Sequence, residues 1–231
     1  MRFSSSGLFA VLVLKTNQET IEAFQPAFET LANMVKTLRE QGQTVERLDI
    51  GGGFPIQYNN ENLLDLSAYA GWVADYILPL DTEIQMEPGR YLTGNAGGLL
   101  SEVIYIKETD DQDFLVLDAG MNDLIRPTLY EAYHHISPVE NHDREERLYD
   151  VVGPICESGD TFTTGRSIPE MHAGEIALIE SAGAYGFVMA SNYNSRELAP
   201  EILIDGDQVA VIRSRQSFEE MVAGEKIPDW L

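Results

Sequence analysis

The chain has 231 residues, of which 44% are hydrophobic, so it is long enough and apolar enough to bury a substantial core. Its 38 acidic and 15 basic side chains give a formal net charge of −23 at pH 7. Such a charge repels phosphates at long range, which argues against nucleic acids or an anionic membrane as partners. The single cysteine, Cys156, excludes an internal disulfide bond and fits a reducing, cytoplasmic compartment.

Residues 1–18 form an atypical start. An apolar run from Phe9 to Leu14 follows Arg2, which gives a superficial likeness to a signal peptide. The run is short, and the residues from Lys15 onwards offer no small-residue cleavage pattern, so a buried strand is the preferred interpretation. The run is also far too short to span a bilayer as a helix, and no membrane association is predicted.

Residues 20–90 alternate between helical and strand-like patterns. Apolar residues recur at spacings of three and four in two stretches, which predicts two amphipathic helices, and a short strand-like run follows each of them. The four predicted elements are, in order, a helix at Ile21–Leu38, a strand at Val45–Ile50, a helix at Leu63–Leu78 and a strand at Glu83–Met86. This order predicts part of a parallel α/β barrel in residues 19–95.

An unusual turn follows each of these two predicted strands. The three glycines at 51–53 can take positive φ angles and point backbone N–H groups at one anion, most often a phosphate. The Glu-Pro-Gly-Arg sequence at 87–90 offers a carboxylate for a protonated ring nitrogen and a guanidinium for a carboxylate or phosphate. Both turns are expected at the carboxyl edge of the sheet, where α/β folds place their sites. Taken singly, a plain turn and a surface ion pair are the alternatives.

The character of the sequence changes after residue 95. Short apolar runs divided by turns predict strands at Leu99–Ile106, Phe114–Asp118, Leu148–Val152 and Glu175–Glu180. The Asp-Gly pair at 205–206 predicts a hairpin tip, and Ser217 with Glu220 fits a capping box for a short last helix. Residues 96–231 are therefore predicted to form an all-β domain of the β-sandwich or β-barrel kind.

Two pairs of residues in this β region have spacing that suits binding or catalysis. Pro127 fits the first turn of a short helix, and Arg126 and Tyr130, four apart, would lie on one face and could hold a carboxylate. An ordinary helix start with a surface arginine is the alternative. Cys156 and Glu157 lie in a loop punctuated by glycine and proline, where a thiol can donate a proton and a carboxylate can recognise an ammonium group. From these residues alone, a structural cysteine is the preferred interpretation.

The histidines do not predict a metal site. Metal-binding histidines usually recur at short helical or turn spacings together with a carboxylate or thiol. No such partner can be identified for His134, His135, His142 or His172. We therefore predict no metal.

Four motifs stand out in the sequence, namely LDIGGGFP at 48–55, EPGR at 87–90, DAGMNDLIRP through YEAYH at 118–134, and GPICESGD at 153–160. Together they resemble the diaminopimelate decarboxylases, which are pyridoxal-phosphate (PLP) enzymes of the alanine racemase-like barrel fold. The last two resemble the diaminopimelate branch rather than the ornithine branch. The similarity runs from about Glu19 to the end of the chain. It implies a partial (β/α)8 barrel, limited to the last strands and helices, followed by the β domain.

The resemblance also implies a role for each matching residue. The residues implied to hold PLP are Gly51, Gly52, Gly53, Glu87, Pro88, Gly89, Arg90 and Tyr185. Those implied to contact the substrate are Arg90, Arg126, Tyr130, Glu157 and Tyr185, with Glu157 at the distal amino group. Cys156 would be the catalytic acid, supplied across the interface of a homodimer. The implied reaction is decarboxylation of meso-2,6-diaminopimelate to L-lysine and CO2. For Tyr185, a core tyrosine is the alternative.

The sequence departs from the family pattern in one respect. The Schiff-base lysine of the family lies on an early barrel strand, and nothing before Ile21 supplies it in its expected place. A complete barrel needs eight strands and roughly 250 residues, whereas this chain has room for two or three strands before its β region. Lys15 follows a strand-like run, but only one helix separates it from the glycines, so we regard it as a coincidence. We expect the carboxyl-terminal half of such an enzyme, inactive alone. A non-catalytic homologue that binds and regulates related subunits, and a truncated or frame-shifted product that folds poorly, are the alternatives.

Overall fold

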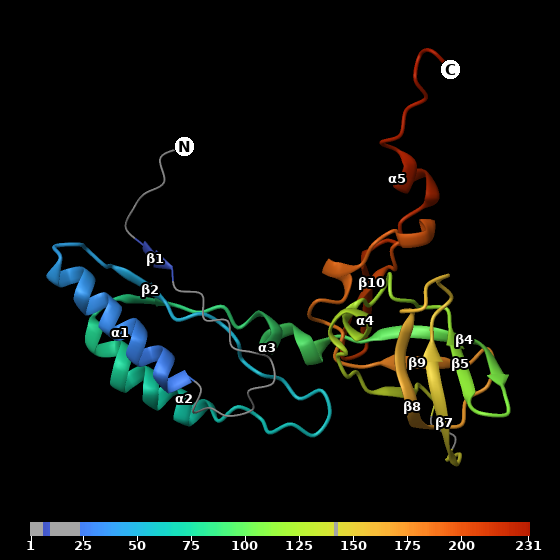
Figure 1. Ribbon diagram of the computed structural model, residues 1–231, viewed down its shortest axis with the longest axis horizontal. Helices are drawn as coiled ribbons and strands as arrows, with labels where there is room; N and C mark the ends of the chain where they lie inside the picture. Colours follow the sequence, from blue (N-terminus) through green and yellow to red (C-terminus); the bar gives the residue numbers. More distant parts are fainter. Residues whose placement is uncertain (1–6, 10–23, 141–142) are drawn as a thin grey trace. The chain divides into compact units, whose positions relative to one another are not determined.

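The structure is a computed structural model that describes residues 7–9, 24–140 and 143–231 (Figure 1). These residues divide into two compact units, the first ending at Ala96 and the second starting at Gly97. Most of the atypical start, including residues 10–14 and Lys15, lies outside the described residues, as does His142. Within the described ranges, no helix is both long and apolar enough to cross a lipid bilayer.

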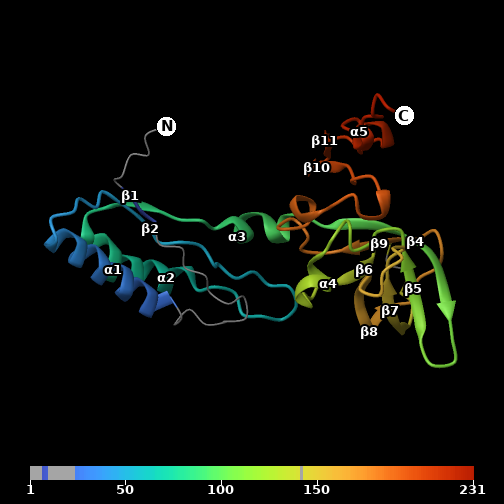
Figure 2. The same ribbon diagram turned by 45° about the horizontal axis from the view of Figure 1, so that its top comes forward.

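The first unit contains a three-stranded parallel sheet and two main helices that lie side by side (Figures 1 and 2). Its strands, in spatial order, are β1 (Gly7–Phe9), β2 (Arg47–Asp49) and β3 (Glu83–Gln85). Its helices are α1 (Phe24–Glu40), α2 (Leu66–Trp72) and the short α3 (Gly89–Thr93), with a π-helical turn at Val73–Ile77 and 3-10 turns at Leu78–Leu80 and Gly94–Ala96. Helix α1 precedes β2 and α2 precedes β3, so the predicted order of helix, strand, helix and strand is confirmed.

Helix α1 is amphipathic, and its predicted apolar face is the one that is buried. Phe24 and Phe28 are 2% and 0% exposed. The ring of Tyr69, on α2, packs against both of them and against Phe54, with centroid distances of 5.1, 5.4 and 4.9 Å. Gly42, with a φ of +82°, follows the end of the helix as predicted. The aromatic cluster therefore joins both helices to the loop that follows β2.

The second unit is built on a six-stranded sheet in which neighbouring strands are antiparallel except for β5 and β7. The spatial order of the strands is β6, β9, β4, β5, β7 and β8. Their bounds are β4 (Leu99–Glu108), β5 (Asp113–Leu117), β6 (Ile136–Pro138), β7 (Glu146–Val152), β8 (Thr161–Pro169) and β9 (Ile176–Ile179). The predicted all-β character of this region is confirmed, although the sequence pattern does not predict β6 or β8.

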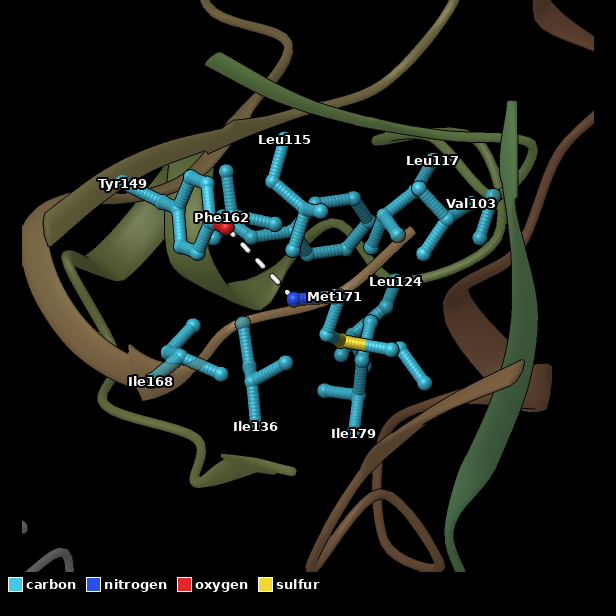
Figure 3. Packing of buried hydrophobic residues seen from close by; sticks show 13 residues of the cluster. Val103, Leu115, Leu117, Leu124, Ile136, Tyr149, Phe162, Ile168, Met171 and Ile179 are labelled. Atoms are coloured by element: carbon cyan, nitrogen blue, oxygen red, sulfur yellow. Dashed lines mark hydrogen bonds between the residues drawn. The ribbon is translucent and has the colours of Figure 1, made fainter. Parts of the chain in front are cut away.

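This sheet curls until its two edge strands approach each other. Arg166 of β8 donates a hydrogen bond of 3.1 Å to the carbonyl of His134, just before β6, and its guanidinium lies 4.0 Å from the ring centroid of Tyr133. The enclosed interior is filled by side chains from the surrounding strands, as Figure 3 shows. The Tyr149 hydroxyl accepts a hydrogen bond of 3.5 Å from the backbone N–H of Met171 inside it. The labelled members of this core are Val103, Leu115, Leu117, Leu124, Ile136, Tyr149, Phe162, Ile168, Met171 and Ile179.

Shorter elements complete the second unit. They are α4 (Arg126–Tyr130), 3-10 turns at Phe187–Met189 and Tyr193–Ser195, the hairpin strands β10 (Glu201–Asp205) and β11 (Gln208–Arg213), and α5 (Phe218–Val222). The predicted hairpin tip is confirmed, with Gly206 at a φ of +60°. The predicted capping box is also confirmed, because Ser217 Oγ accepts from the Glu220 N–H at 3.2 Å and Glu220 Oε2 accepts from the Ser217 N–H at 2.8 Å.

Candidate functional site

The glycine turn after β2 and the charged turn after β3 are in direct contact. The Glu87 N–H donates a hydrogen bond of 3.0 Å to the Gly51 carbonyl. A Cβ atom on Gly52 would overlap the carbonyl oxygen of Glu87. Gly51 and Gly53 have φ angles of +78° and +81°, in the region that favours glycine. Parallel pairing of β2 with β3 produces this contact, because it aligns the carboxyl ends of the two strands.

Asp49, the last residue of β2, fixes the glycine turn. Its side chain is 8% exposed, and its Oδ1 accepts a hydrogen bond of 2.8 Å from the Gly51 N–H. This is the side-chain-to-backbone bond by which an aspartate stabilises the turn that follows it. Sequence reasoning assigned no role to Asp49, although an aspartate two residues before a glycine is a known signal for such a turn.

The Glu-Pro-Gly-Arg turn leads directly into helix α3. Pro88 occupies the N-cap position without a side-chain hydrogen bond, and Gly89 and Arg90 are the first two residues of the helix. Glu87 is exposed and Arg90 is half-buried. The contact therefore places Glu87, three residues before Arg90, beside the positive-φ glycines. The glycine turn itself suits a phosphate, because it has no side chains that would obstruct one.

In the second unit, Arg126 is buried and contacts a buried histidine. Arg126 is 6% exposed and His134 is 3% exposed. Arg126 Nη1 lies 2.9 Å from His134 Nε2, and His134 Nδ1 lies 2.8 Å from the Glu180 carbonyl oxygen. Burial lowers the pKa of the His134 imidazole to about 4, so the ring is neutral at pH 7. Because a guanidinium can only donate, His134 accepts at Nε2 from Arg126 and donates from Nδ1 to Glu180.

The predicted helix that begins near Pro127 is confirmed as α4, but it has only five residues. Tyr130 is 61% exposed, in contrast to the buried Arg126. Glu131, at a φ of +53°, ends the helix. Arg126 is thus held by His134 in the interior of the second unit, while Tyr130, four residues later, is exposed; their joint role in binding a carboxylate stays a prediction.

Cys156 and Glu157 lie in a tight turn between β7 and β8. Cys156 is exposed, so the prediction that its thiol is not a core residue is confirmed. The Asp160 N–H donates to the Glu157 carbonyl at 3.0 Å, and the Gly159 N–H donates to Glu157 Oε1 at 3.3 Å. Thr128 Oγ1 donates to the Gly159 carbonyl at 2.6 Å. The structure therefore brings the turn that carries Cys156 and Glu157 next to helix α4.

The loop after β9 carries two tyrosines. Tyr185 has a φ of +60°, which is uncommon for a residue with a side chain, and it is 43% exposed, so it is not a core tyrosine. Further along this loop, the Tyr193 hydroxyl donates to Glu157 Oε2 at 3.4 Å. Sequence reasoning assigned no role to Tyr193. Its contact shows that the loop after β9 reaches the turn that holds Cys156 and Glu157.

The described residues include three of the four lysines. Lys36 is exposed on α1, Lys107 Nζ lies 5.6 Å from the ring centroid of Phe114, and Lys226 is exposed near the end of the chain. The fourth, Lys15, lies outside the described residues. Among the residues that the structure describes, no group of three or more His, Cys, Asp or Glu side chains could hold a metal ion.

Several known proteins are similar to this chain. The family model described as pyridoxal-dependent decarboxylase, C-terminal sheet domain, matches residues 12–183. A diaminopimelate decarboxylase from Neisseria meningitidis serogroup B is 46% identical over 199 residues, which are 86% of this chain and 48% of that protein. One from Pseudomonas fluorescens is 42% identical over 208 residues, 90% of this chain and 50% of that protein. The chain thus spans about half the length of the curated relatives it matches.

A solved structure is also similar. The diaminopimelate decarboxylase of Helicobacter pylori, complexed with L-lysine, superposes with a TM-score of 0.83 at 38% sequence identity. The match covers 88% of this chain and 50% of that one. The resemblance inferred from the sequence motifs, and with it the pyridoxal dependence of the family, is confirmed.

Proposed function

This chain belongs to the pyridoxal-dependent decarboxylase family, and on that premise we propose that it serves the decarboxylation of meso-2,6-diaminopimelate to L-lysine and CO2. The names of its relatives support this substrate, and the motifs at 118–134 and 153–160 favour it over the substrate of the ornithine branch. PLP, when bound, supplies an electron sink for the electron pair that CO2 leaves behind. Residues of this chain would bind and orient the cofactor and the substrate and deliver a proton.

The observation that carries this proposal is the contact between the glycine turn and the turn of Glu87. Backbone N–H groups of Gly51, Gly52 and Gly53 would bind the PLP phosphate. Glu87 would keep the ring nitrogen protonated, and Arg90 would reach the phosphate or the substrate carboxylate. The hydrogen bond of 3.0 Å between Glu87 and Gly51 supports this assignment, because it holds the two ends of such a ligand site in a fixed register.

The second unit would supply the residues on the substrate side. Arg126 and Tyr130 would bind a carboxylate, and Tyr185 would contact both cofactor and substrate. Glu157 would recognise the distal ammonium group, and the Cys156 thiol would deliver a proton to the carbon that has lost CO2. The exposure of the thiol supports this role, since a proton donor must reach the reacting atom.

We also propose the architecture that the resemblance implies. Residues 19–95 would be the last part of a (β/α)8 barrel, and residues 96–231 the carboxyl-terminal β domain. The parallel order β1, β2, β3 with a helix before each of the last two supports the barrel origin. Cys156 and Glu157 would serve a site shared across a homodimer interface. A cytoplasmic location is part of the proposal, on the ground that the chain has a single cysteine.

The first test is the intact mass of the purified chain after incubation with PLP and reduction with borohydride. A stoichiometric adduct that maps to Lys15 would show that this chain forms a cofactor site by itself. A decarboxylation assay with meso-diaminopimelate would then follow. The absence of an adduct would mean that this chain is catalytically silent alone.

The second test asks whether the chain completes the site of a relative. It would be mixed with the full-length Neisseria meningitidis relative in which the counterpart of Cys156 is replaced by alanine. If Cys156 acts across a subunit interface, CO2 release from meso-diaminopimelate should return, whereas a Cys156→Ala form of this chain should not restore it. Stable mixed dimers without CO2 release would contradict the proposed role of Cys156.

Mixing the chain with the wild-type relative, as well as with its cysteine variant, separates the alternative functions. A regulatory homologue would bind the wild-type relative and change its activity without rescuing the cysteine variant. A truncated product that folds poorly would aggregate, because an incomplete barrel exposes strand edges and apolar helix faces. A monomeric chain with a cooperative thermal transition would argue against this last alternative.

A further inference from the structure

Asp160 is a buried carboxylate that contacts two separate loops. Its residue is 4% exposed. Oδ1 accepts a hydrogen bond of 2.6 Å from the backbone N–H of Met121, in the loop that leads to Arg126. Oδ2 accepts one of 2.6 Å from the N–H of Ile155, the residue before Cys156. One side chain therefore ties together the two loops that carry the proposed substrate-side residues.

Two glycines make room for this carboxylate. A Cβ atom on Gly153 would lie 2.6 Å from Asp160 Oδ1 and 2.7 Å from the Cα atom of Gly120. A Cβ atom on Gly120 would lie 2.9 Å from Ile155 Cγ1 and 3.2 Å from Asp160 Oδ1. The backbones of the two loops therefore touch at these glycines, and the carboxylate spans the contact. Any side chain at Gly153 would push the loops apart.

Backbone groups partly offset the effect of burial on the charge of Asp160. Burial raises the pKa of the Asp160 carboxyl above its ordinary value, and the N–H groups of Ile155 and Met121, followed by the positive charge of Arg196, act in the opposite direction. Hydrogen bonds from N–H groups to an ionised carboxylate are about twice as strong as bonds between neutral groups. Removing this acceptor would leave the buried N–H of Ile155 and the partly buried N–H of Met121 without this partner, which would destabilise the folded state.

The Cys156–Glu157 turn is also closed by the backbone of Asp160. The Asp160 carbonyl accepts from the Gly153 N–H at 3.1 Å, and the Asp160 N–H donates to the Glu157 carbonyl at 3.0 Å. Asp160 thus holds both ends of the segment that contains Cys156. We propose that Asp160 is a positioning residue that fixes Cys156 and Glu157 relative to the loop that leads into Arg126. Its relevance to catalysis rests on the proposed function, but the linkage between the loops does not.

The test is amide hydrogen exchange. In the wild-type chain, the N–H groups of Met121 and Ile155 should exchange with the same free energy of opening, since one carboxylate holds both. In Asp160→Asn, where an amide nitrogen replaces one acceptor oxygen, exchange should rise about tenfold at both loops, because a lost buried hydrogen bond is worth on the order of 1–3 kcal/mol. Strands β4 and β7 should keep their protection.

Asp150→Asn is the matched control. Asp150 Oδ1 also accepts a backbone hydrogen bond, from the Gly165 N–H at 2.7 Å, but it lies on β7 and does not join the two loops. This variant should accelerate exchange only near Gly165. A response to Asp160→Asn confined to residues 154–160, or spread uniformly over the whole unit, would overturn the proposal. So would different opening free energies at Met121 and Ile155 in the wild-type chain, a comparison that needs no variant to fold.

The thiol gives a second readout. Because Cys156 is the single cysteine of the chain, its reaction with an aromatic disulfide reports on this turn alone. The pH profile of that reaction should shift in Asp160→Asn and remain unchanged in Asp150→Asn; an unshifted profile in Asp160→Asn would contradict positioning of the thiol. Neither measurement uses cofactor or substrate. Failure of the decarboxylase proposal would therefore leave these results intact, and the converse also holds.

Discussion

His134 accepts a hydrogen bond of 2.9 Å from the buried guanidinium of Arg126 while it donates one of 2.8 Å to the Glu180 carbonyl. Both bonds require a neutral ring with its proton on Nδ1. Protonation at Nε2 would place an N–H against the N–H of Arg126 and a second positive charge beside the first. The arrangement of Arg126 therefore depends on the charge state of His134.

The stability of the second unit should consequently fall in mild acid. The pKa of His134 is about 4 when folded, against 6.5 as the ordinary value, so the unfolded chain binds more protons between these two values. The contribution of neutral His134 to the free energy of unfolding is fully present above pH 6.5 and is lost as the pH falls towards 4. For this pKa shift the loss is up to about 3 kcal/mol. Urea unfolding at several pH values would measure it. His134→Gln, which does not titrate, should have a flatter dependence, and identical slopes for both proteins would refute the assignment.

Replacing His134 by a residue that cannot accept a hydrogen bond should destabilise the second unit more than replacing it by one that accepts but does not titrate. His134→Phe would leave the Arg126 N–H without this buried partner, which is expected to destabilise the unit by about 1–3 kcal/mol. His134→Gln keeps an amide that can both accept and donate, so its loss at pH 7 should be smaller. Denaturant midpoints of the two variants would show the order, and equal losses would mean that ring packing, not the hydrogen bond, stabilises this position.

The contact between the glycine turn and Glu87 predicts that Gly52→Ala is destabilising. The new methyl group would overlap a backbone carbonyl, which cannot rotate away, and overpacking of this kind costs about 1–3 kcal/mol. Gly71→Ala is the matched control, because Gly71 lies on α2 with nothing within 4 Å of the position of a Cβ atom. That control should be neutral or stabilising by up to about 1 kcal/mol, through helix propensity. Thermal unfolding followed by the fluorescence of Trp72, in the first unit, compares them.

The elements that the sequence predicts well have either an unbroken period of apolar residues or a specific turn signal. Helix α1 repeats apolar residues on one face, and the β10–β11 hairpin has an Asp-Gly tip. Strand β8 lacks a clean alternation because Gly165, at a φ of +55°, interrupts it and the pairing with β7 shifts register. On α2, the apolar spacing predicts Leu66 on the buried face, yet Leu66 is 48% exposed and Tyr69 is buried instead. The aromatic contacts of Tyr69 with α1 decide that orientation, and a local pattern does not contain them.

In the candidate site, too, local sequence patterns predict some features and tertiary contacts decide the others. The glycine and charged turns can be located from the sequence, because parallel strands bring their carboxyl ends together. The roles of His134 and Asp160 cannot, because they arise from burial against backbone groups distant in the sequence, the Glu180 carbonyl and the Met121 N–H. A lone histidine or aspartate carries no periodic signal. Which polar residues become buried is decided by tertiary packing.

A last prediction concerns the ion pair between Arg144 and Glu175, which joins the segment before β7 to the segment before β9. Arg144 Nη1 donates to Glu175 Oε2 at 2.8 Å, Arg144 Nη2 donates to Oε1 at 2.6 Å, and the His172 N–H donates to Oε2 at 2.9 Å. The hydrogen bonds from Arg144 lower the pKa of Glu175 to about 2 from an ordinary 4.5. The stabilisation of the folded state by this ion pair is therefore present above pH 4.5 and is lost as the pH falls from 4.5 towards 2.

Glu175→Gln should accordingly lower the Tm at neutral pH by about 2 °C, a modest value because both side chains are partly exposed. The difference from wild type should shrink in acid below pH 4.5 and at high salt. Glu108→Gln is the control, because Glu108 also binds an arginine, Arg147, at 2.6 Å but is 67% exposed. Its effect at neutral pH should be smaller, because water screens an exposed pair more strongly. A Tm difference for Glu175→Gln that persists unchanged in acid would mean that the carboxylate charge is not what Arg144 recognises.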